Sequence, residues 1–292
     1  MRAESFGAAS SAARAGRVSV ASAIALVFMS GASAMGQTNK IMITGYWPPT
    51  NEMIRPFSQN IAQNPGGWQG GNWEGRGYDI HSYFPEFPGG VDVNPRGTGD
   101  FQVDYQAASN DFWRIVDELK PVAIITFSRG SFGSNWELES RARKLPLSQW
   151  SPDYLAPTRP TSDLPIANEP NNFIRHSSLP MANIRDAVNA ANLGVSGFID
   201  TSNSFGGNFV SEFTSYHSAW YANLHASPDD PFRCVAGGHI HVGVNTTVAA
   251  ATTATQITLR ELITHVNTIV PAPSTATIGL GALAIAGLRR RR

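Results

Sequence analysis

Two hydrophobic periods alternate along the body of the chain. Short segments rich in apolar residues predict strands, and they lie at 41–45, 78–87, 122–127, 195–199 and 234–242. Apolar residues at helical spacing predict amphipathic helices, and these lie at 106–120, 180–194, 208–224 and 255–267. Because strands and helices alternate, we expect an α/β fold, a three-layer sandwich with a mainly parallel central sheet.

Three further segments have neither period. Positions 145–180 contain seven prolines and predict a long irregular excursion, whose composition leaves open whether it covers a site or mediates contacts. The Thr- and Ala-rich positions 246–255 have the composition of a linker, although the helix that follows has an apolar face. Charged residues crowd positions 137–144, a pattern that is also typical of a solvated helix face.

The N-terminus has the order of regions found in export signals. A basic start precedes the apolar run 18–29, and positions 32–34, Ala-Ser-Ala, supply the small residues that a signal peptidase requires. We therefore predict a signal peptide at 1–34 and a folded domain at 35–269. The alternative is a buried N-terminal helix. The single cysteine, Cys234, fits an exported chain without an internal disulfide and excludes a CxxC metal site.

The C-terminus, 270–292, combines a Pro-containing motif, a short apolar segment and four arginines. As a helix, 278–288 would rise only about 16 Å against roughly 30 Å of hydrocarbon. The pattern resembles the PEP-CTERM sorting tails of exported proteins in Gram-negative-type bacteria, although Ala272 stands where that family usually has Glu. The resemblance implies a transient membrane anchor, cut near Pro273 by a sorting protease. It also implies a final location in the periplasm, at the outer surface or in the extracellular matrix. A short hydrophobic helix with a basic end is the alternative.

The formal net charge of zero conceals an acidic body. Seven arginines lie in the leader and in the terminal tetrad, and without these two segments the chain carries about −6. An acidic surface repels phosphates, so we expect no nucleic acid partner.

Three segments concentrate reactive side chains where strands are expected to meet helices. They carry a carboxylate at Glu139, a hydroxyl at Ser211 and an imidazole at His241, the parts of a nucleophile, base and orienter triad. Catalytic groups of open α/β sheets gather at the carboxyl ends of strands. Each residue also has a structural interpretation: Ser211 as an ordinary first-turn residue, Glu139 on a solvated helix face and His241 as a core histidine.

The local sequence around these residues resembles that of pyroglutamyl peptidase I, also called pyrrolidone-carboxylate peptidase. Members of this family are cysteine peptidases that remove an N-terminal pyroglutamate. Positions 44–48, Thr-Gly-Tyr-Trp-Pro, resemble the family's opening Thr-Gly-Phe-x-Pro. Positions 139–142, Glu-Ser-Arg-Ala, stand where the family has Glu-Arg-x-Ala, and 240–242 reproduce its Ile-His-Val. The distant resemblance runs from about 41 to 267 and implies a phosphorylase/hydrolase-like fold and a peptide or small amide substrate.

The nucleophile position departs from that pattern. The family has Cys-Asn-x-x-x-Tyr, whereas 211–216 read Ser-Glu-Phe-Thr-Ser-Tyr. A serine hydroxyl ionises at far higher pH than a thiol, so Ser211 requires His241 as a true general base, oriented by Glu139. Glu212 places a carboxylate beside the nucleophile. Its negative charge would stabilise the N-terminus of the helix but would repel an oxyanion that develops there.

If the chain is a hydrolase of this kind, we expect six residues to take part. Ser211 attacks the carbonyl of the N-terminal lactam, His241 transfers the proton and Glu139 fixes the imidazole tautomer. Tyr46, Trp47 and Phe209 line the pocket for the lactam ring; the aromatic pair 46–47 is alternatively part of the core. Backbone N–H groups near 129–130 and at the start of the Ser211 helix are candidates for the oxyanion hole. No cofactor and no metal ligand belong to this set.

Two rival functions remain open at this point. Ser211 in place of the family's catalytic cysteine, together with the sorting tail, favours a catalytically inactive homologue that acts as a cell-surface or matrix binding protein. His239 and His241, two residues apart on an expected strand, point to one face as a pair of metal ligands does, which suggests a metal-dependent hydrolase. Cys234 is a second candidate nucleophile, but about 23 Å of extended chain separates it from His241.

Overall fold

The centre of the protein is a mixed six-stranded sheet, seen in a computed structural model that describes residues 38–130, 133–203 and 206–270. The predicted signal peptide and sorting tail lie outside the described residues. In spatial order the strands are β2 (Asp79–Tyr83), β1 (Lys40–Thr44), β3 (Ala123–Arg129), β8 (Ala236–Val242), β4 (Asn135–Glu139) and β7 (Ser196–Asp200). Neighbouring strands are parallel except β8 and β4.

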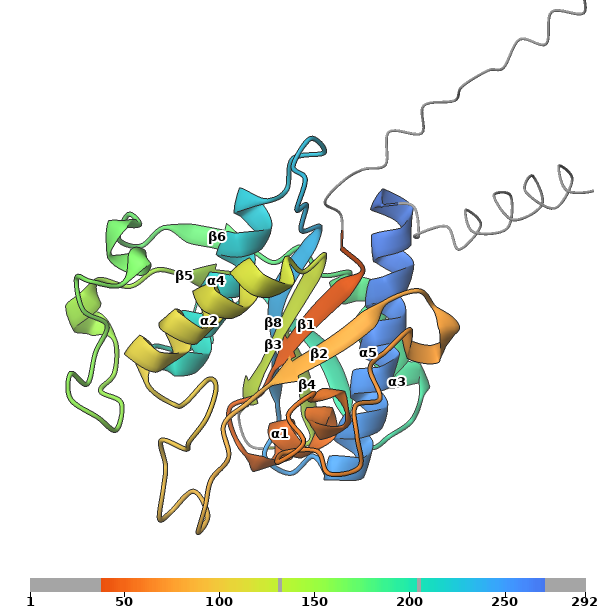
Figure 1. Cartoon of the computed structure of the whole chain (residues 1–292), viewed down its shortest axis with the longest axis horizontal. Helices are drawn as coiled ribbons and strands as arrows, with labels where there is room; N and C mark the ends of the chain where they lie inside the picture. The colour runs from red at the N-terminus through yellow and green to blue at the C-terminus, as the bar shows by residue number, and fades with distance from the viewer. Residues whose placement is uncertain (1–37, 131–132, 204–205, 271–292) are drawn as a thin grey trace, which may run out of the picture. The chain divides into compact units, whose positions relative to one another are not determined.

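Helices cover both faces of the sheet (Figure 1). On one face lie α2 (Tyr105–Leu119) and α4 (Val210–Leu224), and on the other lie α1 (Pro48–Ile54), α3 (Met181–Ala190) and α5 (Val248–Ile269). The described part also contains four short 3₁₀ turns, η1 (Arg55–Phe57), η2 (Trp73–Gly75), η3 (Leu147–Gln149) and η4 (Pro165–Asn168). The expected three-layer α/β sandwich with a mainly parallel sheet is confirmed. None of the described helices has an apolar stretch long enough to cross a bilayer.

The linker interpretation of 246–255 is wrong, because most of that segment is the first part of α5. The Thr247 hydroxyl caps the helix by accepting a hydrogen bond from Ala250 N at 3.2 Å. Ala254 and Thr255 are fully buried against the sheet side of the helix. Alanine has the highest helix propensity, so the cap and the buried face outweigh the threonines.

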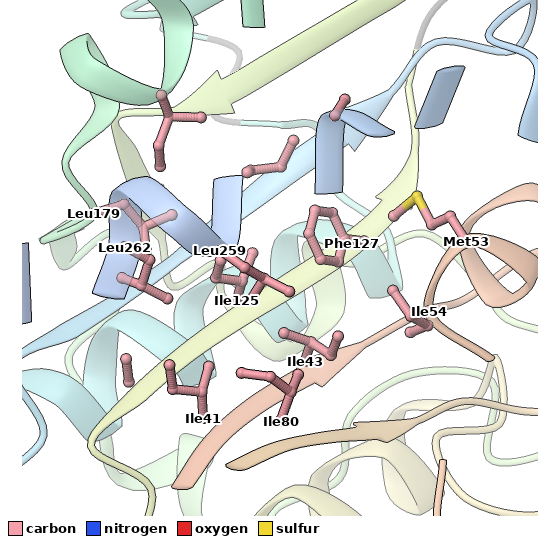
Figure 2. Packing of buried hydrophobic residues seen from close by; sticks show 14 of the residues in the cluster. Ile41, Ile43, Met53, Ile54, Ile80, Ile125, Phe127, Leu179, Leu259 and Leu262 are labelled. Carbon is pink, nitrogen blue, oxygen red and sulfur yellow. The ribbon is translucent and has the colours of Figure 1, made fainter. Parts of the chain in front are cut away.

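The alternation of side chains along β3, β4 and β8 divides the sheet into an apolar face and a polar one. Ile125, Phe127, Leu138 and Ile240 enter the core shared with α1, α3 and α5, part of which Figure 2 shows. The intervening residues of the same strands point to the α4 side, and they are Thr126, Ser128, Glu137, Glu139, His239 and His241. The chemistry of the chain is therefore concentrated on one side of three adjacent strands.

The charged segment at 137–144 forms strands, so its interpretation as a solvated helix face is wrong. Its first part belongs to β4, and β5 (Arg141–Arg143) pairs with β6 (Ile174–His176) in a separate antiparallel sheet. The glutamates of β4 alternate with Trp136 and Leu138, which are fully buried. This alternation is a strand period that the charges conceal.

The Pro-rich excursion packs onto the α2 and α4 side of the molecule. It has the irregular course that the prolines predict, and Trp150, Leu164 and Ile166 are buried in the same cluster as α2 and α4. Tyr154 of the excursion is exposed and lines a pocket of about 560 Å³. One part of this segment therefore borders the candidate site.

Candidate active site

The polar face gathers its side chains through strand register. Glu137 stands opposite His241 in the antiparallel pair of β4 and β8, and Glu139 stands opposite His239. Asp200 stands beside Glu139 on the parallel neighbour β7. Paired residues point to the same face of a sheet. The carboxylates of Glu137 and Glu139 therefore become neighbours of the His241 imidazole, which lies more than a hundred positions later in the chain.

Glu139 and His241 form the central contact of the site. His241 Nδ1 lies 2.7 Å from Glu139 Oε1, and both side chains are buried, with exposed fractions of 7% and 2%. An ionised carboxylate only accepts hydrogen bonds, so Nδ1 is the donor and Nε2 carries the lone pair. This tautomer is the one that a general base needs.

Ser211 lies in the first turn of α4 and lines the same cavity as this pair. The cavity measures about 230 Å³, and its lining includes Glu137, Glu139, Gly206, Ser211 and His241. Within the described residues, no hydrogen bond links the Ser211 hydroxyl to His241. The three predicted catalytic residues therefore share one cavity, and two of them are in direct contact.

The proposed metal-binding pair of histidines does not present two free nitrogens. His239 Nδ1 lies 2.7 Å from Thr126 Oγ1, and Nε2 lies 2.8 Å from Ser128 Oγ. Burial lowers the pKa of this fully enclosed imidazole well below its usual value, with the nearby His241 adding to the effect. His239 is thus a neutral residue held by two hydroxyls, and the structure does not support it as a metal ligand.

A larger, aromatic pocket of about 560 Å³ adjoins this cavity, and Ser211 and Arg129 line both. All three predicted substrate-binding residues, Tyr46, Trp47 and Phe209, line it. The Arg129 guanidinium lies 5.5 Å from the centre of the Trp47 ring, a cation–π contact that places a positive charge where the two spaces meet.

Glu212 is a residue whose environment the sequence did not reveal. Its Oε1 accepts a hydrogen bond from Arg143 N at 2.5 Å, whereas Oε2 has no partner among the described residues. Burial, reinforced by the charge of Glu139, raises the pKa of Glu212 well above its usual value. Burial therefore disfavours the negative charge that the sequence places beside the nucleophile.

Gly206 explains how these groups lie so close together. Its φ of +72° is a left-handed conformation that glycine adopts without strain. A Cβ at this position would lie 3.1 Å from Glu212 Oε2, 3.1 Å from His241 Cε1 and 3.4 Å from the Glu139 carboxyl carbon. The Gly206 backbone thus lies directly against the three side chains.

Sequence reasoning also missed Glu137, Asp200 and the boundary position of Arg129. Burial raises the pKa of Glu137; the charges of Glu139 and Asp200 add to this effect, and His241 opposes it. The available signal was the alternation of polar and apolar residues in 135–139 and 239–242, which identifies one polar face.

Cys234 lies outside this site and precedes β8. It is 1% exposed, and burial raises the pKa of its thiol to about 12. Because the thiolate is the reactive form, we expect a colorimetric thiol reagent to leave the native protein unmodified over minutes at pH 8 and to titrate one thiol after denaturation. Rapid reaction of the native protein would contradict this assignment and make Cys234 a candidate nucleophile again.

The comparisons with known proteins bear on the fold. No protein-family model and no curated protein matches the chain. Among solved structures it is similar to pyrrolidone carboxyl peptidase from Thermococcus litoralis, with 14% identity, a TM-score of 0.54, and coverage of 81% of this chain and 99% of that one. A mutant of the Pyrococcus furiosus pyrrolidone carboxyl peptidase gives 15% identity, a TM-score of 0.53, and coverage of 77% and 99%. The fold is that of the pyrrolidone carboxyl peptidases. This is the family that the motifs around Glu139 and His241 resemble.

Proposed function

We propose that the protein is a hydrolase that removes N-terminal pyroglutamate or cleaves a related small amide through Ser211, His241 and Glu139. The observation that carries the proposal is the 2.7 Å contact between His241 Nδ1 and Glu139 Oε1 beside a cavity that Ser211 lines. The pyrrolidone-carboxyl-peptidase fold and the ordered motifs support the substrate class.

Each residue has a defined step in this reaction. Ser211 Oγ attacks the carbonyl carbon while its proton passes to His241 Nε2, and Glu139 stabilises the imidazolium that forms. The imidazolium then gives this proton to the leaving amine, and water hydrolyses the acyl-enzyme by the same route in reverse. Gly130 N already donates to Val242 O at 2.8 Å, so the candidate oxyanion donors are the first-turn N–H groups of α4.

The aromatic pocket is the place for the acyl group in this proposal. Trp47, Phe209 and the buried Tyr46 line this pocket, and their rings supply apolar surface for a small ring. Export is proposed on the sequence alone: a signal peptidase removes 1–34, and a sorting protease processes the tail at 270–292 after transient anchoring in the membrane.

The test is hydrolysis of a fluorogenic pyroglutamyl amide by the purified full chain. We expect Ser211→Ala to lower kcat/KM by about 10³-fold or more, because the nucleophile is lost. Ser211→Cys restores the thiol of the family at the same place and should retain or raise activity. Ser215→Ala, on the same helix one turn further on, is the matched control and should stay within a few-fold of wild type.

Two results would contradict the proposal. One is full activity in Ser211→Ala. The other is no activity in the wild type. If Ser211→Cys is then active, the site is preserved but disarmed; if both are inactive, the rival function of a binding protein that retains the fold is favoured. The observation that favours this rival is that, within the described residues, no hydrogen bond joins the Ser211 hydroxyl to His241, although a working triad requires one.

A further inference from the structure

Three potential metal ligands converge on the cavity side of β4 and β8. One carboxylate oxygen each from Glu137 and Glu139 and one ring nitrogen of His241 all lie within 4.8 Å of one another. Glu137 and His241 are paired directly across β4 and β8, and Glu139 lies two positions further along β4, so the rigid sheet holds the three side chains together. The ligand atoms of a four-coordinate zinc ion lie about 3.3 Å from one another. Small rotations of these side chains would therefore bring all three ligand atoms within bonding distance of one common ion.

A second observation at the same place is a buried carboxyl oxygen that lacks a partner. Glu212 is 1% exposed, and its Oε2 has no hydrogen-bond partner among the described residues. This oxygen and His241 Cε1 each lie 3.1 Å from the same point, the place of a Cβ on Gly206. An orphaned, buried carboxyl oxygen thus lies near the place where the Glu139 and His241 side chains meet.

The surroundings add negative charge. Asp200 lines the cavity together with Glu137 and Glu139. Arg129, which also lines the aromatic pocket, supplies the positive charge in the described lining of the cavity. Carboxylates that share a small cavity repel one another, and a divalent cation relieves that repulsion.

We propose that Glu137, Glu139 and His241 form a binding site for one divalent transition-metal ion, with Zn²⁺ as the best-fitting ion. Imidazole with carboxylates is a donor set that suits Zn²⁺, whereas Mg²⁺ and Ca²⁺ prefer six or more oxygen ligands. The cavity leaves the remaining coordination positions to water.

The ion and the triad exclude each other, an inference that rests on the proposed function. A neutral imidazole has one lone pair. If His241 gives that lone pair to the metal, its other ring nitrogen carries the proton and has nothing with which to accept the Ser211 proton. The metal-bound state is therefore inhibited, and chelation restores the base.

The experiment is isothermal titration of ZnCl₂ into the chelator-treated full chain, which requires no turnover. We expect one ion per chain and a dissociation constant that rises at least ten-fold in Glu137→Gln and in His241→Ala. Glu118→Gln removes an exposed acid on α2 and is the matched control, with unchanged affinity. MgCl₂ in place of ZnCl₂ should give no binding heat.

Two outcomes would overturn the site. One is no Zn²⁺ binding by the wild type, and the other is unchanged binding by both Glu137→Gln and His241→Ala. A matching unfolding temperature without metal shows that a variant is folded. Should a variant be unfolded, paramagnetic NMR of the wild type with bound Co²⁺ tests the imidazole ligand: a spectrum without a shifted, exchangeable imidazole N–H signal would also overturn the site. Inhibition of pyroglutamyl amide hydrolysis by Zn²⁺ is a separate measurement. Binding without any peptidase activity would leave the metal site standing while the proposed function fails.

Discussion

Replacing His241 by alanine should lower kcat/KM for a pyroglutamyl amide by about 10³- to 10⁴-fold. The substitution removes the only imidazole that is both in contact with Glu139 and in the lining of the Ser211 cavity, within the described residues. A serine cannot compensate by ionising, because its hydroxyl has no appreciable anionic fraction near neutral pH. The measurement is steady-state kinetics of the purified protein with added chelator.

Two companion variants make this prediction specific. His176→Ala removes an exposed histidine on β6 and should change kcat/KM by no more than a few-fold. Glu139→Gln tests the positioning role: the side chain keeps its shape, but it no longer stabilises the imidazolium and no longer selects the tautomer. We expect a lower kcat with a similar KM and a shifted pH–rate profile, which a purely structural effect would not produce. Activity in His241→Ala near the wild-type value would exclude the triad.

Most of the framework could be predicted from periodicity alone. The segments of α2 and α4 have apolar residues at helical spacing, and β1 and the start of β3 are apolar runs, so local pattern and final structure agree there. The pattern did not predict α1, β5, β6 or the first part of α5, and the clearest exception is β4. It is five residues long, and its two glutamates conceal the alternation with Trp136 and Leu138, so its charge suggested a solvated helix face.

The candidate site could be predicted only in part, because its contacts depend on strand order. Glu139 and His241 are separated by 102 positions, and the antiparallel pairing of β4 with β8 is what brings them together. Nothing local to Glu212 indicates that its carboxyl is buried beside them, since burial depends on the loop at Gly206 and on Arg143 of β5. Residue types and motif order therefore predict the participants, and register and packing decide which of them meet.

Gly237→Ala should reduce both stability and activity, because Gly237 sets the distance between β8 and α4. A Cβ there would lie 2.4 Å from Ser218 O and 2.7 Å from the Ala222 side chain, both on α4. Backbone cannot rotate away as a side chain can, so the helix must shift. Overpacking of this kind costs about 1–3 kcal/mol, which lowers the Tm of a domain of this size by roughly 2–10 °C.

The effect on catalysis follows from the same shift. Ser211 lies on α4 and His241 on β8, four residues beyond Gly237, so a displaced helix moves the nucleophile away from its base. A misplacement of about 1 Å costs about 10²-fold in rate, more than the loss of stability explains well below Tm. Gly66→Ala is the matched control, since the nearest atom to its Cβ would be 3.7 Å away. Thermal unfolding and pyroglutamyl amide kinetics check both effects, and a Gly237→Ala protein with wild-type Tm and rate would show that the contact between β8 and α4 does not position Ser211.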